Sequence, residues 1–281
     1  MKKEQSGLTR RALLQGALTA GSAVGMAGAS PIIAFAQRGG RGAGAEADAP
    51  DGPSSNVALQ FARMLNQTKY ADLPPKAVEY AKVIIASTIA SAASGSAIGS
   101  ARIVRELAKE HGGKPESTIW FDGAKAPANE VARVNAILSD AAASDDSDIR
   151  NTAHEGTSLA SAGLAVAERV GASGQDLLLA IVIGYEAAGR IGAARRGGQR
   201  SVHASQIVSF GGAVAAAKLL KCTDQQMAHA INLNALTMGG LGMGTESWSR
   251  EYMGANAAYT GVNSALAASR GYEVLDRKSV V

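Results

Sequence analysis

The amino-acid sequence predicts an all-α protein, and three observations support this fold class. Apolar residues recur at helical spacing through most of the chain from Asn56 onward, whereas the alternation of strand and helix segments that a parallel sheet requires is not found in the sequence. Helix start signals precede several of these segments. Ala and Gly are abundant, which would let neighbouring helices approach closely. We therefore expect one compact helical domain over residues 56–275.

The composition limits the kinds of partner that the protein can have. The chain has 281 residues, of which 46% are hydrophobic and 4% aromatic, and this is enough for a substantial core. Its net charge is +4, but the first fifty residues hold six basic and three acidic residues, which leaves only +1 for the rest. A nearly neutral domain with few aromatic residues argues against nucleic-acid binding.

The N-terminal segment has the pattern of an export signal. Residues 1–36 contain Arg10-Arg11 in a context similar to a twin-arginine motif, then a weakly apolar stretch, and then Ala34-Phe35-Ala36, which fits a cleavage site. The alternative, a membrane anchor, is disfavoured because many small residues make this stretch only modestly hydrophobic. We expect a periplasmic protein without a stable membrane anchor after cleavage, in which a flexible linker over residues 37–55 precedes the domain.

The first elements of the domain can be placed from their start and stop signals. Asp72 and Pro74-Pro75 predict the start of a helix that ends at Gly95. The expected buried face of this helix comprises Val78, Ala81, Ile84, Ile85 and Ile89. A shorter amphipathic helix follows around residues 103–107, and residues 117–121 have strand character but are too few to found a sheet.

Two variants of the capping box predict later helices. Ser173 and Asp176 precede a segment, residues 177–185, that is apolar on most sides and is expected to form a central buried helix. Thr223 and Gln226 begin another helix in the same way. The single Cys222 lies just before this second signal and cannot form an internal disulfide.

The densest polar cluster of the chain lies between two apolar helical segments, around residues 131–143 and 159–167. Its charged members are Asp145, Asp146, Asp148, Arg150 and His154. One interpretation is that the carboxylates cap the second helix, because they accept hydrogen bonds from free backbone N–H groups and suit the positive end of the helix dipole. The other is proton transfer to a small polar substrate, with the carboxylates tuning the pKa of the His toward neutrality.

Three stretches of the domain carry a resemblance to a known family. The first contains, in order, Asn135, Asp145, Asp146, Ser147 and His154. The second covers residues 171–187 (GASGQDLLLAIVIGYEA), with Arg190 and the segment 200–203 after it, and the third covers residues 250–261. These stretches resemble the landmarks of the MmgE/PrpD family, which includes 2-methylcitrate dehydratase, cis-aconitate decarboxylase and iminodisuccinate epimerase.

The resemblance implies a fold, a reaction and a set of site residues. The fold is the family's helical domain, while the α+β lid domain that completes the site in family members is missing from this chain, so the chain alone is expected to be inactive. The implied enzyme is a lyase or isomerase that works without a cofactor, as a homodimer, and abstracts a proton next to a carboxylate of a small di- or tricarboxylic acid. The residues implied to be catalytic are Asp146, Ser147, His154 and His203. The residues implied to bind the substrate are Asp145, Arg250 and Asn256.

The chain also departs from the family pattern. Ala143 stands where the family normally has Asp, and Asp140 where it often has His; Arg250 replaces Lys, and Met253 replaces His. Arg stays protonated, but its planar fork binds a carboxylate through two hydrogen bonds, which favours a substrate clamp over proton transfer. The alternatives are therefore a non-catalytic carboxylate-binding paralogue, or an epimerase instead of a dehydratase.

Neither a metal site nor a dinucleotide site is predicted. The acidic cluster lacks the alternating ligands of a calcium loop, and no His/Cys pair has zinc spacing. The Gly-rich residues 239–244 do not follow a strand, as a dinucleotide fingerprint would. Residues 276–281 are what a common sequencing-adapter string encodes, so we expect an artefactual tail and a natural gene that continues beyond Leu275.

Overall fold

The computed structural model describes residues 57–150, 153–194, 205–237, 239 and 247–274. The chain divides into two units, Met1–Asp51 and Gly52–Val281. The first unit lies wholly outside the described residues, as do the predicted export signal and linker. The following description therefore concerns the second unit alone.

The described residues form nine α-helices, one short 3-10 helix and one pair of very short strands, which confirms the all-α prediction. The helices are α3 (Val57–Gln67), α4 (Pro75–Gly95), α5 (Gly99–His111), α6 (Ala128–Ala142), α7 (Glu155–Val170), α8 (Gly174–Ala194), α9 (Ser205–Leu219), α10 (Asp224–Thr237) and α11 (Trp248–Ser269). The 3-10 helix η1 (Tyr70–Asp72) precedes α4. Strand β1 (Ser117–Thr118) pairs with β2 (Lys125–Ala126) in antiparallel fashion.

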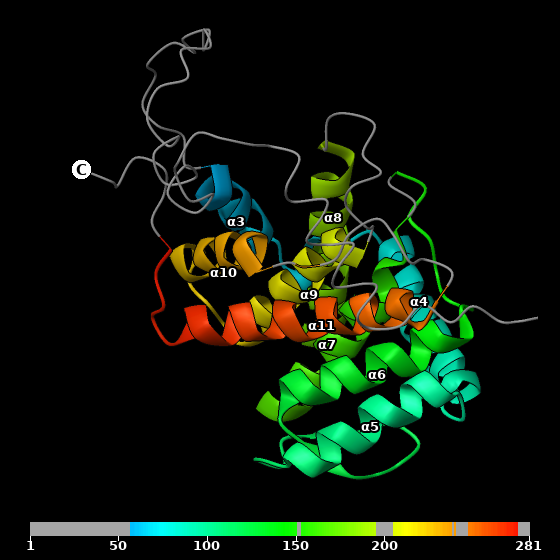
Figure 1. Ribbon diagram of the computed structural model, residues 1–281. Coiled ribbons are helices and arrows are strands. Elements are labelled where there is room, and N and C mark those ends of the chain that lie inside the picture. The colour runs from blue at the N-terminus through cyan, green and yellow to red at the C-terminus, as the bar shows by residue number, and fades with distance from the viewer. Residues whose placement is uncertain (1–56, 151–152, 195–204, 238, 240–246, 275–281) are drawn as a thin grey trace, which may run out of the picture. The chain divides into compact units, whose positions relative to one another are not determined.

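Helix α7 is the centre of the helical unit. It packs against α4, α6, α8, α9 and α11, and it lies behind α11 in Figure 1. Its residues are buried from Glu155 to Gly163 and again from Ala165 to Ala167. This position matters for function because the N-terminus of α7 is where the polar cluster of the sequence lies.

The sequence analysis had assigned the central position to α8, and this was wrong. Within the described part of the chain, Leu177, Leu178 and Val182 of α8 are only half-buried, so this helix is not enclosed on all sides. By length and apolar composition α8 is also sufficient to cross a membrane, but half of the relevant segment is buried inside the protein, as in a core helix of a bundle. An all-round apolar pattern therefore does not by itself distinguish a central helix from one that borders a cavity.

Small residues allow the closest helix contacts, as the sequence predicted. A Cβ atom on Gly261 of α11 would lie 2.7 Å from the carbonyl oxygen of Ser209 on α9. At Gly95, the last residue of α4, a Cβ atom would collide with the carbonyl oxygen of Leu138 on α6. Glycine at these two positions lets the backbones of neighbouring helices touch, so even one added methyl group would force them apart.

The predicted helix boundaries near caps and prolines are confirmed. Helix α4 begins at Pro75 and ends at Gly95. Ser173 and Asp176 exchange hydrogen bonds in a capping box, since the Ser173 hydroxyl accepts from the Asp176 backbone N–H at 3.1 Å and the Asp176 carboxylate accepts from the Ser173 backbone N–H at 3.2 Å. Thr223 and Gln226 form the equivalent pair at α10.

Candidate active site

The polar cluster lies in the connection between α6 and α7. Helix α6 ends at Ala142, and Ala143 follows with a φ of 50°, a left-handed conformation that turns the chain away from the helix axis. The connection then runs to His154, the residue directly before the first helical residue Glu155. The acidic side chains are thereby placed at the positive end of a largely buried helix, where negative charge is stabilised.

Asp146 caps α7 from ten residues away. Its Oδ1 atom accepts a hydrogen bond from the backbone N–H of Gly156 at 2.8 Å, and its Oδ2 atom accepts one from the Tyr185 hydroxyl at 2.8 Å. Burial raises the pKa of Asp146, although these two hydrogen bonds oppose the shift. A Cβ atom on Gly156 would collide with the carboxylate, so glycine is required here for this contact. The capping interpretation therefore holds for this side chain.

Asp145 holds His154. The Nδ1 atom of His154 lies 3.3 Å from Oδ1 of Asp145 and 2.8 Å from the carbonyl oxygen of Asp146. The hydroxyl of Thr157 donates a hydrogen bond to the other oxygen of Asp145. The Asp145 side chain is 1% exposed and the His154 ring 49% exposed, so a buried anion supports a histidine that solvent and ligands can reach.

This environment makes His154 a cation at neutral pH. The contact with Asp145 is the largest of the causes that raise the pKa of His154 to about 9, and the Asp146 carbonyl adds to it. Burial opposes ionisation of Asp145, but its contacts with His154 and Thr157 outweigh burial and lower its pKa. The expectation that the carboxylates tune His154 toward neutrality is therefore wrong. A close buried carboxylate stabilises the imidazolium well beyond that point.

A second ion pair, between Arg250 and Asp140, lies next to this one. The sequence marks Asp140 only as a departure from the family pattern. The Nη2 atom of Arg250 donates to the carbonyl oxygen of Asp140 at 2.7 Å, and its Nη1 atom lies 3.4 Å from the Asp140 carboxylate. Burial raises the pKa of Asp140 to about 6, while Arg250 opposes the shift and Asp145 adds to it. The guanidinium group of Arg250 is thus held against Asp140, and its predicted role as a substrate clamp stays a prediction.

The remaining predicted site residues are more scattered. Ser147 is exposed beside Asp146. Asn256 is half-buried on α11 and borders a small cavity that Gln206, Ser209 and Thr260 also line. His203 lies outside the described residues. The structure therefore brings Asp145, Asp146 and His154 together, whereas Arg250 pairs with Asp140 and Asn256 lies at a separate small cavity.

The sequence analysis missed two partners of the cluster, Tyr185 and Thr157. Tyr185 had been counted with the apolar face of its helix, but a half-buried Tyr hydroxyl usually finds a hydrogen-bond partner, and here that partner is Asp146. Thr157 lies in the first turn of α7 and had no distinguishing pattern around it. Within the described part of the chain, no three His, Cys, Asp or Glu side chains are placed to share a metal ion.

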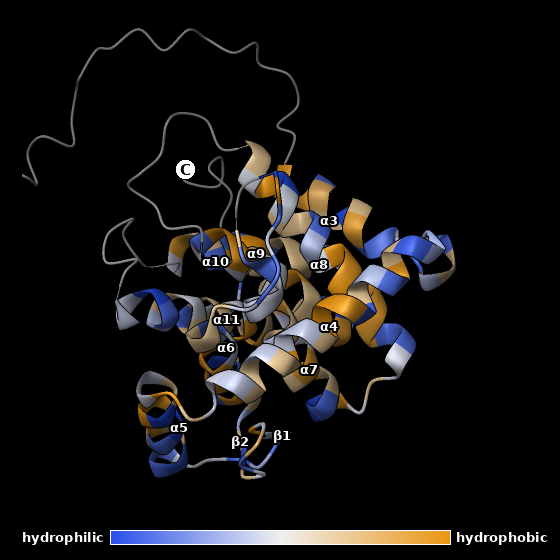
Figure 2. Cartoon of the chain, turned by 90° about the vertical axis from the view of Figure 1, so that its right-hand side faces the viewer, coloured by the Kyte–Doolittle hydropathy of each residue, from blue (hydrophilic) through white to orange (hydrophobic). Residues whose placement is uncertain are grey.

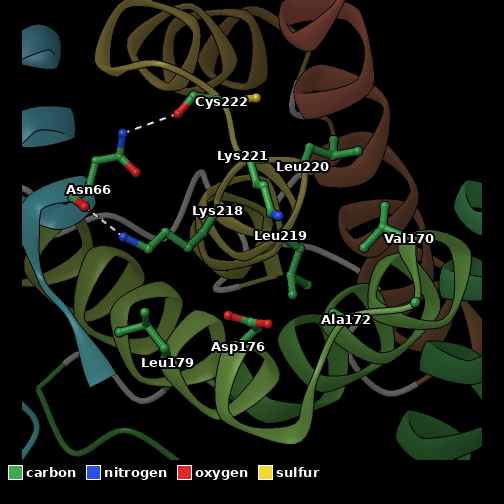
Figure 3. Close-up of a pocket in the computed structure, with 11 residues that line it drawn as sticks. Asn66, Val170, Ala172, Asp176, Leu179, Lys218, Leu219, Leu220, Lys221 and Cys222 are labelled. Carbon is green, nitrogen blue, oxygen red and sulfur yellow. Dashed lines mark hydrogen bonds between the residues drawn. The ribbon is translucent and has the colours of Figure 1, made fainter. Parts of the chain in front are cut away.

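Two pockets of similar volume lie in the helical unit. One, of about 680 Å³, lies between α4 and α8 and includes Asp146, Ser147 and Tyr185 in its wall. The other, of about 670 Å³, lies at the C-terminal end of α7, where Lys218 donates to the carbonyl oxygen of Asn66 at 2.6 Å (Figure 3). Among the predicted site residues that the structure describes, none lines this second pocket, and the length of α7, about 24 Å, separates it from the cluster.

Fold and site together define a class of protein: an all-helical domain in which a central, largely buried helix begins beside two carboxylates and a protonated histidine. These groups are suited to acid–base chemistry. The sequence model of the MmgE/PrpD N-terminal domain matches residues 59–277, so the chain belongs to the MmgE/PrpD family, as its sequence landmarks predicted. The chain is similar to the cis-aconitate decarboxylase-like protein oryM of Aspergillus oryzae, with 27% identity over 244 residues. That match covers 80% of this chain and 50% of the relative, so the chain spans about half the length of the curated relative it matches.

Proposed function

We propose that this protein is a cofactor-independent enzyme of the lyase or isomerase type that abstracts a proton next to a carboxylate of a small di- or tricarboxylic acid. The observation that carries the proposal is the half-exposed His154 cation, held from behind by the buried Asp145 carboxylate. Partial burial of a charged ring at a helix start costs free energy that packing alone does not require. It suits a group that meets an anionic ligand from solvent.

His154 would serve as an acid in this chemistry. With a pKa of about 9 it carries its proton at neutral pH, so it can hydrogen-bond a substrate carboxylate or protonate a leaving hydroxyl group. Asp145 keeps the ring oriented, and Asp146 adds its carbonyl oxygen as a second acceptor. His154 would therefore donate a proton, whereas a neutral histidine at this position would accept one.

An elimination balances with these groups as follows. A base takes the proton from the carbon next to a carboxylate, and the electron pair of that C–H bond forms the new double bond. The C–O bond to the neighbouring hydroxyl breaks, and the hydroxyl takes a proton from His154 to leave as water. We propose His203, which lies outside the described residues, as the base. Epimerisation would begin with the same proton abstraction. In decarboxylation the C–C bond to the leaving CO2 breaks instead, its electron pair stays with the substrate, and a substrate carbon takes a proton from an acid such as His154.

The family and the relative support this class of reaction at a coarse level. The relative is named as a cis-aconitate decarboxylase-like protein, and a tricarboxylic acid of this kind has the acidic C–H bond that the mechanism needs. We further propose twin-arginine export to the periplasm, on the motif at Arg10-Arg11, and a homodimer, on the family resemblance.

One observation favours a non-catalytic carboxylate-binding protein as the second candidate. Arg250 is engaged with Asp140 through both a backbone and a side-chain contact, and an Arg cannot take part in proton transfer at neutral pH. If Arg250 and Ala143 no longer take part in proton transfer, the His154 cation would remain as a group that binds an anion.

Proton exchange in D2O distinguishes the two candidates. Citrate and 2-methylcitrate are incubated with the protein expressed from its native locus, and their C–H resonances are followed by ¹H NMR. The enzyme should replace the C–H signal with deuterium or consume it by turnover. Line broadening without loss of C–H intensity would refute the catalytic proposal and support the binding protein.

A further inference from the structure

The pocket between α4 and α8 has a chemistry that the acid–base cluster does not explain. Its volume of about 680 Å³ is in the range of small-molecule pockets. Its lining includes Asp146, Ser147 and Tyr185, which belong to or adjoin the candidate active site. The rest of the wall comes from the two helices, so the pocket extends away from the cluster.

Most of this wall is apolar. Ala77, Val83 and Ile84 line it from α4, and Ile181 and Val182 line it from α8. Figure 2 shows hydrophobic residues along the facing parts of these two helices. Val83 is 59% exposed, so an apolar side chain is left in water at the pocket rim. Exposed apolar surface beside a pocket is typical of a binding site.

Several polar side chains in the wall already have protein partners. The Tyr185 hydroxyl donates to Asp146, and the Glu186 carboxylate accepts from both Arg150 and Arg190. The hydroxyl of Ser87, on the α4 side, donates to a carbonyl oxygen of its own helix at 3.0 Å. A ligand group in this part of the pocket would gain few hydrogen bonds. Its main gain would be the burial of apolar surface.

Asp146 connects the pocket to the cluster. Its backbone carbonyl oxygen contacts Nδ1 of His154, and the residue is also one of those that line the pocket. A ligand whose carboxylate is bound by His154 would therefore have the remainder of the molecule within reach of the apolar wall. The pocket adjoins the cluster through Asp146, although His154 and Asp145 are not themselves among its lining residues, whereas the second large pocket lies at the other end of α7.

We propose that this pocket is a subsite for an alkyl substituent, so that the substrate is a di- or tricarboxylic acid with an apolar chain of several carbons. The proposal rests on the proposed function for the placement of the carboxylates at His154. It goes further by assigning the substrate class and the residues, on α4 and α8, that select it.

The test is the affinity of a series of alkylsuccinates measured by calorimetry on the 281-residue chain, because binding can be measured whether or not the chain turns over. Methyl-, butyl-, hexyl- and octylsuccinate share one dicarboxylate head. Affinity should rise about fourfold for each added methylene group, the gain that corresponds to its full burial. Equal affinity across the series, or no binding of any member, would overturn the proposal.

Four variants separate the tail from the head. Ala77→Trp places a large ring in the pocket and should abolish the gain with chain length, whereas Ala86→Trp, on an exposed position of the same helix outside the pocket, should keep it. Val83→Gln alters the exposed rim, tests the same point if Ala77→Trp does not fold, and should reduce the gain. His154→Gln should weaken every member of the series by a similar factor and leave the gain per methylene unchanged.

The failure of this inference can be told from the failure of the proposed function. Deuterium exchange of 2-methylcitrate without any chain-length effect would remove the subsite and keep the enzyme. A chain-length effect without exchange of any acid would keep the subsite and remove the enzyme. Light scattering adds the last outcome: if Ala77→Trp dissociates a dimer while Ala86→Trp does not, the pocket is covered by a second copy of the chain, and the subsite is excluded.

Discussion

Replacement of Asp145 by Asn should lower the pKa of His154 by more than one unit. In the wild type the Asp145 carboxylate lies 3.3 Å from Nδ1 of His154 and is the largest cause of the pKa of about 9. An amide has nearly the same shape but no charge. The carbonyl oxygen of Asp146, 2.8 Å from the same nitrogen, remains as a partner. Burial of the ring, which lowers the pKa, also remains, so the pKa should fall by more than about one unit toward its ordinary value.

The same substitution should flatten the pH dependence of stability. The folded-state pKa of His154 is raised above its ordinary value of 6.5, so its stabilising contribution is complete below pH 6.5 and is lost as the pH rises through about 9. A shift of this size would correspond to about 3 kcal/mol for a fully buried ring. Because 49% of the side chain is exposed, solvent screening should reduce the effect to about 1 kcal/mol. Most of this loss between pH 6.5 and 9 should disappear in Asp145→Asn.

Two measurements check this prediction. ¹H NMR titration of the histidine Cε1–H signals gives the pKa, with the His154 signal identified by its absence in His154→Gln. Urea unfolding at pH 6.5 and pH 9 gives the stability difference. Glu186→Gln is the control, since it removes a carboxylate that binds Arg150 and Arg190 instead of His154. A His154 pKa that moves by less than about 0.5 units in Asp145→Asn would refute the electrostatic account of the site.

Three further predictions follow from other contacts. Arg250→Met leaves the buried Asp140 carboxylate without its cation, so the pKa of Asp140 should rise above its present value of about 6. Urea unfolding should then show a larger stability loss at pH 8, where Asp140 is ionised in the wild type, than at pH 5. An equal loss at both pH values would contradict the ion pair. Gly261→Ala places a Cβ atom 2.7 Å from the Ser209 carbonyl oxygen and should lower the free energy of unfolding by about 1–3 kcal/mol; wild-type stability would show that α9 and α11 are not in backbone contact. Substitution of Arg10-Arg11 by two Lys should leave the protein in the cytoplasm with its signal uncleaved. Cell fractionation tests this, and normal accumulation of the variant in the periplasm would exclude the twin-arginine route.

Elements with local signals could be predicted closely from the sequence. Helix α4 begins and ends where Pro75 and Gly95 indicated. The proline acts through its own backbone geometry, whereas Gly95 is an ordinary helical residue that permits close contact with the backbone of α6. The capping pairs at Ser173 and Thr223 were also predicted, since both partners lie within four residues of each other. The same start and stop signals predicted the order of these helices along the chain.

Features that depend on the three-dimensional arrangement could not be predicted in this way. The apolar surface of α8 indicated a central helix, but whether an apolar face meets a neighbouring helix or a cavity depends on the packing of α4 beside it. The charge of His154 was expected near the neutral range, but its pKa of about 9 depends on one contact with the buried carboxylate of Asp145. The hydrogen bond between Tyr185 and Asp146 joins residues 39 positions apart and has no local signal.

The most direct measurement of the central claim compares turnover and stability in His154→Gln, with His111→Gln on the exposed end of α5 as a matched control. Gln keeps the size and hydrogen-bonding capacity of His but cannot carry the charge. If His154 acts as the acid, the rate of C–H exchange or turnover should fall about 100-fold or more, the usual contribution of general acid–base catalysis. The free energy of unfolding should change by no more than about 1 kcal/mol. Unchanged turnover in His154→Gln, together with a lowered melting temperature, would show that the cluster only caps α7 and would contradict the claim.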